Sequence, residues 1–170
     1  MTILTDSGLN VVMRAAKAED LAELESIRQA AFVPIFASFR AILGEEIYEL
    51  AQAAEDRAQD KLLALAIAPD SDWQVYAAEL DGTLVGFVSI QLNIETKVGE
   101  IGLNAVHPNQ AGQGIGTVMY RFAVAKMKEA EMQVATVATG GDPSHAAARR
   151  AYEKAGFMVQ IPSVWMCQKL

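Results

Sequence analysis

The sequence predicts a single α/β domain, spanning residues 1–170, whose sheet mixes antiparallel and parallel strands. Residues 73–92 form two runs of alternating apolar residues around Asp81-Gly82, a dipeptide typical of tight hairpin turns. Residues 97–138 follow the pattern strand, helix, strand, which places two strands parallel in one sheet. The 170 residues are 52% apolar and 21% charged, which suffices for one domain with a substantial core.

The first part of the chain adds one strand and three helices. Residues 10–14 are a short β-favouring run. The acidic segment Ala18-Glu19-Asp20 opens a helix whose apolar residues then recur at helical spacing. Residues 33–43 predict a second short helix ending at Gly44. Residues 45–66, rich in Ala, Glu, Gln and Leu, predict a longer helix.

The rest of the chain supplies most of the sheet. Apolar alternation and β-branched runs predict strands at residues 73–80, 83–92, 97–106, 133–138 and, for the most part, 157–170. Amphipathic spacing predicts helices at residues 117–130 and 144–155. With the short helix at residues 33–43 left out, the expected order is β-α-α-β-β-β-α-β-α-β.

Charge and cysteine content narrow the function classes. The chain has 14 Lys and Arg against 21 Asp and Glu, a net charge of -7, opposite to the basic footprint of a nucleic-acid-binding protein. Its one cysteine, Cys167, allows no internal disulfide, as expected in a reducing compartment. No run reaches the ~18 apolar residues that a membrane span needs. We expect a cytoplasmic protein with no nucleic-acid or membrane partner.

Three alternating glycines, Gly112, Gly114 and Gly116, lie between the predicted strand 97–106 and the helix 117–130. A glycine-rich turn at a helix N-terminus leaves backbone N–H groups free and forms an anion site suited to phosphate. An ATP-type P-loop needs Lys after its last glycine, where Thr117 stands. A Rossmann dinucleotide fingerprint needs another glycine spacing and an acid after the next strand, where the chain has only glycines.

At this turn the chain resembles the GNAT (general N-acetyltransferase) superfamily. Family members carry a strand that often ends Val-His-Pro, then R/Q-x-x-G-x-G/A and a helix; here Val106-His107-Pro108 precedes the three glycines. A second segment, Tyr152-Glu153-Lys154-Ala155-Gly156-Phe157, is similar to the family's Tyr-Glu-Lys-x-Gly-Phe. The resemblance covers residues 10 to about 170. It implies a mixed, mostly antiparallel sheet of six to seven strands, helices on both faces, and splayed strands that form a CoA cleft.

The resemblance also implies the chemistry. A primary amine of a small molecule or peptide would attack the thioester of acetyl-CoA directly, without a metal. The Val106 N–H would polarise the carbonyl and Tyr152 would serve as general acid. The implied cofactor contacts are Ala105, Val106, Ala111, Gly112, Gln113, Gly114, Ile115, Gly116, Thr117, His145 and Ala148.

Two positions depart from the family pattern, and the acid and base roles depend on the residues present here. Ala111 stands where Arg or Gln is usual, and His145 stands in place of Asn. Proton transfer from a phenol of pKa about 10 to a thiolate of pKa about 8.5 is uphill by roughly 2 kcal/mol, so Tyr152 would act mainly by hydrogen bonding to sulfur. Residues 133–140 contain no carboxylate, which leaves Glu100, ahead of Glu95, as the candidate general base.

The acceptor is the least defined part of the prediction. In this fold it would lie among residues 32–48 and 91–95, where Phe32, Phe36, Phe39 and Tyr48 suggest an aromatic pocket. The alternative function is a catalytically silent CoA-binding module with a sensing or scaffold role, which would bind CoA without turnover. A homodimer through the C-terminal strands is suggested by analogy with the family.

Overall fold

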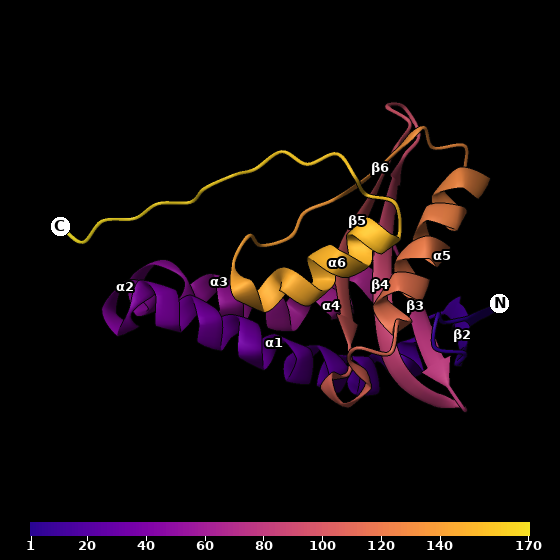
Figure 1. Ribbon diagram of the computed structural model, residues 1–170, viewed down its shortest axis with the longest axis horizontal. Coiled ribbons are helices and arrows are strands. Elements are labelled where there is room, and N and C mark those ends of the chain that lie inside the picture. The colour runs from indigo at the N-terminus through magenta and orange to yellow at the C-terminus, as the bar shows by residue number, and fades with distance from the viewer.

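The computed structural model of this chain describes residues 1–170 and confirms the mixed α/β fold (Figure 1). Its one sheet has six strands in the order β1-β2-β3-β4-β5-β6. The strands are β1 (Thr2–Leu4), β2 (Asn10–Ala15), β3 (Trp73–Leu80), β4 (Thr83–Asn93), β5 (Val98–Val106) and β6 (Val134–Val137). The α-helices are α1 (Leu21–Leu43), α2 (Glu45–Ala51), α3 (Ala53–Ala58), α4 (Leu62–Ile67), α5 (Ile115–Glu129) and α6 (Ala146–Lys154).

Strand pairing follows the sequence order. Strands β1 to β5 pair antiparallel with their neighbours, and β3 and β4 form the hairpin predicted at Asp81-Gly82. Strand β6 pairs parallel with β5, as the strand–helix–strand pattern predicted. This parallel pair is the only place in the sheet where two strands are joined by a crossover helix, α5.

Each face of the sheet has its own core. Helices α5 and α6 cover one face, where Met119, Phe122 and Tyr152 pack with Val88 and Ile90 of β4. Helices α1 and α4 cover the other face; their side chains there are Leu24, Ile27 and Leu63, packed on Phe87 and Ala105. Figure 1 shows α1 and α5 on opposite sides of the strands. We call these the α6 face and the α1 face.

The helices before β3 differ from the prediction. The predicted break near residue 33 is wrong, because α1 continues through Pro34 to Leu43. A proline removes a single N–H donor, and the burial of Leu24 and Ile27 on the sheet holds the helix together. The single helix predicted at residues 45–66 is wrong as well, because the chain folds it into α2, α3 and α4.

The side chain of Asp56 explains the break between α2 and α3. This buried carboxylate accepts hydrogen bonds from the Tyr48 hydroxyl at 2.7 Å and from the Gln52 side chain at 2.8 Å. Those contacts draw α3 back toward α2, and the backbone at Gln52 leaves the helical region with φ -126°. A buried carboxylate needs such donors, so tertiary hydrogen bonding overrides the helical composition.

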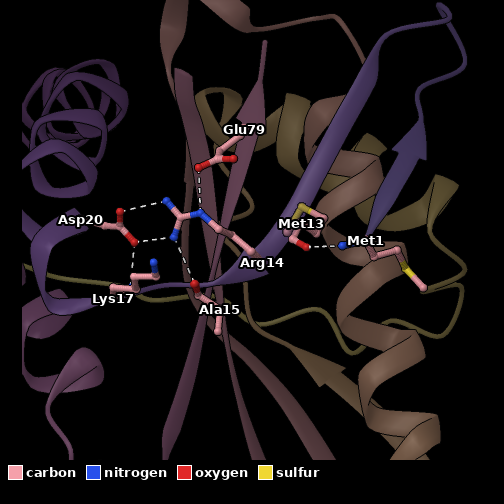
Figure 2. Close-up of polar contacts among 7 residues, drawn as sticks. All are labelled: Met1, Met13, Arg14, Ala15, Lys17, Asp20 and Glu79. Atoms are coloured by element: carbon pink, nitrogen blue, oxygen red, sulfur yellow. Dashed lines mark hydrogen bonds and ion pairs between the residues drawn. The ribbon is translucent and has the colours of Figure 1, made fainter. Parts of the chain in front are cut away.

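The two ends of the chain also differ from the prediction. Strand β1 was not expected from the sequence; it forms a hairpin with β2, and the N-terminal ammonium of Met1 donates to the Met13 carbonyl at 2.8 Å (Figure 2). The strand predicted at residues 157–170 is wrong. That segment has no regular secondary structure, and Pro162 within it cannot donate to a strand ladder.

Arg14 fastens β2 to the segment that leads into α1. Its guanidinium donates to Glu79 on β3 at 2.7 Å and to both carboxylate oxygens of Asp20 at 2.6 and 2.9 Å (Figure 2). Asp20 also accepts the backbone N–H of Lys17, so one carboxylate caps the short turn before α1. The Arg14 hydrogen bonds lower the pKa of Asp20 despite its burial.

Candidate functional site

The site begins where β5 and β6 separate. Their pairing ends at Ile101 and Val137, but β5 continues to Val106 with no strand on that side. At the end of β5 the His107 N–H donates to Val85 on β4 at 2.8 Å. Because N–H groups alternate sides along a strand, the N–H groups of Val106 and Asn104 point away from β4. They line the open edge, and their position supports the predicted role of the Val106 N–H.

A β-bulge sets which side chain faces this opening. Val88 pairs with Asn104 and Ile90 pairs with Ile101, so Ser89 opposes two residues of β5, Gly102 and Leu103. The buried Ser89 hydroxyl donates to the Leu103 carbonyl at 2.9 Å and stabilises the bulge. Residues three apart in a regular strand face opposite sides. The bulge therefore brings Asn104 onto the α6 face.

Asn104 connects two tyrosines from the two helices of that face. Its Nδ2 donates to the Gly102 carbonyl at 2.8 Å and to the Tyr152 hydroxyl oxygen at 3.0 Å, and its Oδ1 accepts from the Tyr120 hydroxyl at 2.8 Å. A backbone carbonyl only accepts, so the contact with Gly102 fixes which end of the amide is the NH₂ group. Tyr152 therefore receives a hydrogen bond, and its own O–H proton stays free to donate.

Packing holds the two tyrosines in this arrangement. Their rings stack with centroids 4.1 Å apart, and both side chains are buried. Burial raises the pKa of Tyr152, although the hydrogen bond from Asn104 acts in the opposite direction. Burial also raises the pKa of Tyr120 well above the usual value. Both phenols are therefore protonated throughout the neutral range, and Tyr152 can donate a hydrogen bond.

The glycine-rich turn lies at the other end of the opening, before α5. Gly114 is the N-cap residue of α5 in the left-handed region, φ +85°, and Gly112 has φ +78°. No side chain caps this helix, so the N–H groups of its first turn have no protein partner. A side-chain atom added at Gly112 would meet nothing within 4 Å, which leaves the turn open on that side.

The turn between β1 and β2 is hydrogen-bonded to the glycine-rich turn. The Ser7 hydroxyl donates to the Gln113 carbonyl at 3.0 Å and also contacts the Thr5 hydroxyl at 2.8 Å. The flanking glutamines bond to each other, with Gln113 Nε2 donating to Gln110 Oε1 at 2.8 Å, while Ala111 is exposed and offers no polar group. Free N–H groups, a helix dipole and an open approach together suit a phosphate.

Several predicted cofactor contacts can act only through their backbone. The side chains of Ile115 and Thr117 are buried under α5, and Ala105 is buried on the α1 face. Ala148 is half-buried and packs against the α6-face core. At these positions, only the main-chain N–H and C=O groups remain candidates for the predicted cofactor contacts.

His145 precedes α6 and belongs to a polar cluster. Its Nδ1 lies 2.5 Å from Asp142 Oδ1, and the Ser38 hydroxyl of α1 donates to Asp142 Oδ2 at 2.9 Å. Its ring stacks on Phe39 of α1, with centroids 5.9 Å apart. The cluster thus joins α1 to the start of α6.

The remaining predicted residues lie apart from this network. Glu100 is exposed and pairs with Gln91, one position before Ile101, so its side chain is on the face opposite to Asn104 and Tyr152. Glu95 is exposed in the turn after β4. Among the predicted acceptor aromatics, Phe39 contacts His145, whereas the Tyr48 hydroxyl is bonded to Asp56. No group of three or more His, Cys, Asp or Glu residues could hold a metal ion, and no helix is long and apolar enough to cross a membrane.

The sequence prediction assigned no role to Tyr120, to the side chain of Asn104, or to Ser38. Asn104 carried a signal, since it is a lone amide in an otherwise apolar strand end. Tyr120 reads as an ordinary helix residue, and Ser38 is on a helix far away in sequence. The sequence prediction likewise assigned no role to Asp142. These roles depend on contacts between distant segments.

Comparison with known proteins agrees with this geometry. A family model described as "Acetyltransferase (GNAT) family" matches residues 36–157. No curated relative matches the chain. The PaiA N-acetyltransferase from Thermoplasma acidophilum, solved with coenzyme A, is 20% identical with a TM-score of 0.67, and the match covers 90% of this chain and 92% of that one.

Two further solved structures have the same fold. A ribosomal-protein-alanine N-acetyltransferase from Brucella melitensis biovar Abortus 2308 is 20% identical with a TM-score of 0.55, covering 94% of this chain and 99% of that one. An aminoglycoside acetyltransferase from an uncultured soil metagenomic sample, solved with sisomicin, is 16% identical with a TM-score of 0.55, covering 94% and 96%. Since the family model matches more than half of the sequence, this chain belongs to the GNAT acetyltransferase family.

Proposed function

We propose that this protein transfers the acetyl group of acetyl-CoA to a primary amine of a small molecule or peptide, by direct attack of the amine on the thioester. One observation carries the proposal. The open edge of β5, the uncapped start of α5 and the free proton of the Tyr152 hydroxyl border the same opening in the sheet. The start of α5 would bind the phosphates of acetyl-CoA, the edge of β5 would pair with its amides, and the Tyr152 hydroxyl would contact its thioester.

The binding part of the proposal rests on unpaired backbone groups. The pyrophosphate would accept hydrogen bonds from the N–H groups of residues 113–116, where the helix dipole also favours negative charge. The pantetheine amides would pair with the free edge of residues 102–106, as an added strand does. The open glycine turn and the missing strand partner fit such a ligand.

The chemical part uses two donors. As the amine nitrogen attacks the carbonyl carbon, negative charge develops on the oxygen, and the Val106 N–H would stabilise it. The C–S bond then breaks and its electron pair leaves on sulfur. The Tyr152 hydroxyl would donate a hydrogen bond to that sulfur. Because burial raises the pKa of Tyr152, stabilising the thiolate by this hydrogen bond contributes more than complete proton transfer.

The test measures CoA thiol release from acetyl-CoA with a panel of amines, and identifies the N-acetyl product by mass spectrometry. Tyr152→Phe should lower kcat about 10- to 100-fold, because one charge-assisted hydrogen bond contributes about 1.5–3 kcal/mol. Tyr76→Phe is the matched control, since its hydroxyl contacts only Gln74. Thiol release that Tyr152→Phe does not slow would remove the assigned acid.

The names of the structural neighbours point to different acceptor classes. One structural neighbour is named for a ribosomal-protein alanine and another was solved with the aminoglycoside sisomicin, and both are less than 25% identical to this chain. The net charge of -7 favours cationic amines in general. The alternative function, a CoA-binding module without catalysis, predicts CoA binding with no thiol release for any amine in the panel.

We also propose that two copies of the chain associate through the C-terminal segment, residues 158–170. Its large apolar side chains are strongly exposed, with Val159 at 95%, Ile161 at 93% and Val164 at 83%. Contiguous exposed apolar side chains are typical of an interaction surface. The full chain should sediment as a dimer at high concentration, and a chain ending at Phe157 should remain monomeric. A monomeric full chain would contradict this.

A further inference from the structure

The cluster of Asp142, His145 and Ser38 has features that a helix cap does not need. The two side chains of the Asp142–His145 pair are 13% and 18% exposed. Asp142 Oδ2 accepts from Ser38 at 2.9 Å, from the Ser144 hydroxyl at 2.5 Å and from the Ser144 N–H at 3.0 Å. The other oxygen is left for His145. Three donors therefore hold the carboxylate in one orientation toward the imidazole.

The state of the carboxylate determines the tautomer of His145. Burial alone would raise the pKa of Asp142, but hydrogen bonds from Ser144, Ser38 and His145 outweigh it and hold that pKa well below its usual range. An ionised carboxylate only accepts, so Nδ1 of His145 must carry the proton. Nε2 then holds the lone pair. Nε2 accepts no hydrogen bond from the protein. Arg28 Nη1 is the one fully buried side-chain nitrogen or oxygen atom without a hydrogen-bond partner, so Nε2 of His145 is accessible to solvent.

The position of His145 relates it to the reaction site. It is the N-cap residue of α6, and Tyr152 follows seven residues later, two turns along the same face of the helix, about 10 Å along the axis. Tyr152 faces the opening at Asn104. Phe39 and Ser38 bring α1 against the other side of the cluster. His145 therefore lies where α1 and α6 meet beside the opening, toward the region predicted for the acceptor.

We infer that His145 is the general base that deprotonates the acceptor amine, with Asp142 and Ser38 as positioning residues. The inference rests on the proposed function. Nε2 of His145 accepts a proton from the acceptor ammonium, directly or through one water, and the freed nitrogen lone pair attacks the thioester carbonyl carbon. As the C–S bond breaks and sulfur takes its electron pair, the nitrogen loses a second proton. That proton passes to the sulfur, which accepts a hydrogen bond from the Tyr152 hydroxyl and leaves as the CoA thiol, and His145 later releases its own proton to solvent.

This assignment supplies what the carboxylates predicted from the sequence lack. The Glu100 side chain is exposed and has no hydrogen-bond partner that would orient it. His145, in contrast, is oriented by its hydrogen bond to the Asp142 carboxylate. Imidazole is the side chain that exchanges protons most readily near neutral pH. A lysine-type amine costs about 4–5 kcal/mol to deprotonate at pH 7, so a positioned base matters most for such acceptors.

Asp142 is the charged side chain that bonds directly to His145. The charged groups near it are Asp142 and, on α6, Arg149, whose guanidinium donates to the carbonyls of Gly140 and Asp142. Helix α1 contributes Ser38 and Phe39, while the next residue, Arg40, pairs with Glu45 and Glu49. Gly140 is also required there, since a Cβ at this position would lie 2.5 Å from His145 Nδ1.

The test uses the full chain and the amine that wild type acetylates fastest. His145→Gln should lower kcat/KM for the amine about 100-fold at pH 7, a loss much larger than any change in the Kd for CoA, which is measured by calorimetry. Its deficit should shrink as pH rises toward the pKa of the free amine, because the amine then needs no base. Added imidazole should restore part of the rate in His145→Ala.

A merely structural role would not move these readouts in the same way. Asp142→Asn should reproduce the pH-dependent deficit, because an amide partner no longer selects the Nδ1–H tautomer, and Ser38→Ala should show a smaller one. If wild type acetylates no amine, the proposed function falls. If wild type turns over but His145→Gln matches it across the pH range, the proposed function stands and the general-base assignment is overturned.

Discussion

At the residue scale, the orientation of one amide side chain organises the candidate site. Asn104 receives a hydrogen bond from Tyr120 and gives one to Tyr152, and its contact with the Gly102 carbonyl excludes the flipped amide. The network therefore runs in one direction, from Tyr120 to the hydroxyl proton of Tyr152. The same tyrosine without this amide would be free to donate its proton to a protein acceptor instead of to the sulfur.

Removal of the Tyr120 hydroxyl tests this direction. Tyr120→Phe keeps the ring stacked on Tyr152 but leaves Asn104 Oδ1 without its donor, so we expect kcat for thiol release to fall about 3- to 10-fold, which corresponds to roughly 0.7–1.4 kcal/mol. The KM for acetyl-CoA should not change. Because both hydroxyls act on one path, Tyr120→Phe added to Tyr152→Phe should cause no further loss. Independent, multiplicative losses would show that Tyr120 acts elsewhere.

The sequence revealed the site residues unevenly. The glycine turn and Tyr152 belong to short local motifs, so their sequence neighbours are enough to predict them. The role of Asn104 depends on the bulge opposite Ser89, which is a feature of strand register. The positioning of His145 depends on Ser38, which is 104 residues away from Asp142 in the chain. Contacts of this kind leave no periodic signal in one sequence.

At the element scale, the turn before α5 should separate ligand binding from stability. Gly112 and Gly82 share φ +78°, and a Cβ at either position meets nothing within 4 Å. Replacing either by Ala should lower the free energy of unfolding by about 1–2 kcal/mol, because an L-residue is strained there. Only Gly112→Ala should also weaken CoA binding, measured by calorimetry. Equal CoA affinity in the two variants would place the phosphates away from this turn.

The Arg14 cluster predicts a pH dependence of stability. Arg14→Met should lower the free energy of unfolding by about 1 kcal/mol at pH 7, measured by urea denaturation. The folded pKa of Asp20 is lowered, so this stabilisation is fully present above its unfolded pKa of about 3.9 and is lost as pH falls through the folded pKa.

The variant and wild type should therefore converge in acid. Arg121→Met serves as the control, because its ion pair with Asp6 is long, at 3.4 Å, and exposed. It should change stability by less than about 0.5 kcal/mol at any pH. A gap between wild type and Arg14→Met that stays constant down to acid pH would show that Asp20 is not the partner that matters.

Some helices and strands can be predicted from local sequence, whereas others depend on tertiary contacts, as is the case for the site residues. Alternating strands β3 to β5 and helix α5 follow from the sequence, because hydrophobic periodicity is local. The continuation of α1 past Pro34 depends on burial of its first half, and the break at Gln52 depends on the Asp56 carboxylate. A short run such as β1 gains its pairing only from the hairpin with β2.

At the scale of the whole molecule, the last residues stand outside the two cores. Residues 158–170 make only exposed polar contacts, Gln160 with Glu153 and Lys169 with Glu46. Phe157, in contrast, packs edge-on against Tyr152. A chain ending at Phe157 should therefore melt within about 2 °C of the full chain under dilute, monomeric conditions. A fall of more than about 5 °C would show that the segment is covered by the domain in solution.

We propose that acetyl-CoA binds across the opening between β5 and β6, with its phosphates at the start of α5. A crystal structure of the wild-type protein with CoA tests this most directly. We expect phosphate oxygens on the N–H groups of residues 113–116, pantetheine along residues 102–106, and the CoA sulfur within hydrogen-bonding distance of the Tyr152 hydroxyl. CoA bound elsewhere, or its sulfur far from Tyr152, would contradict it.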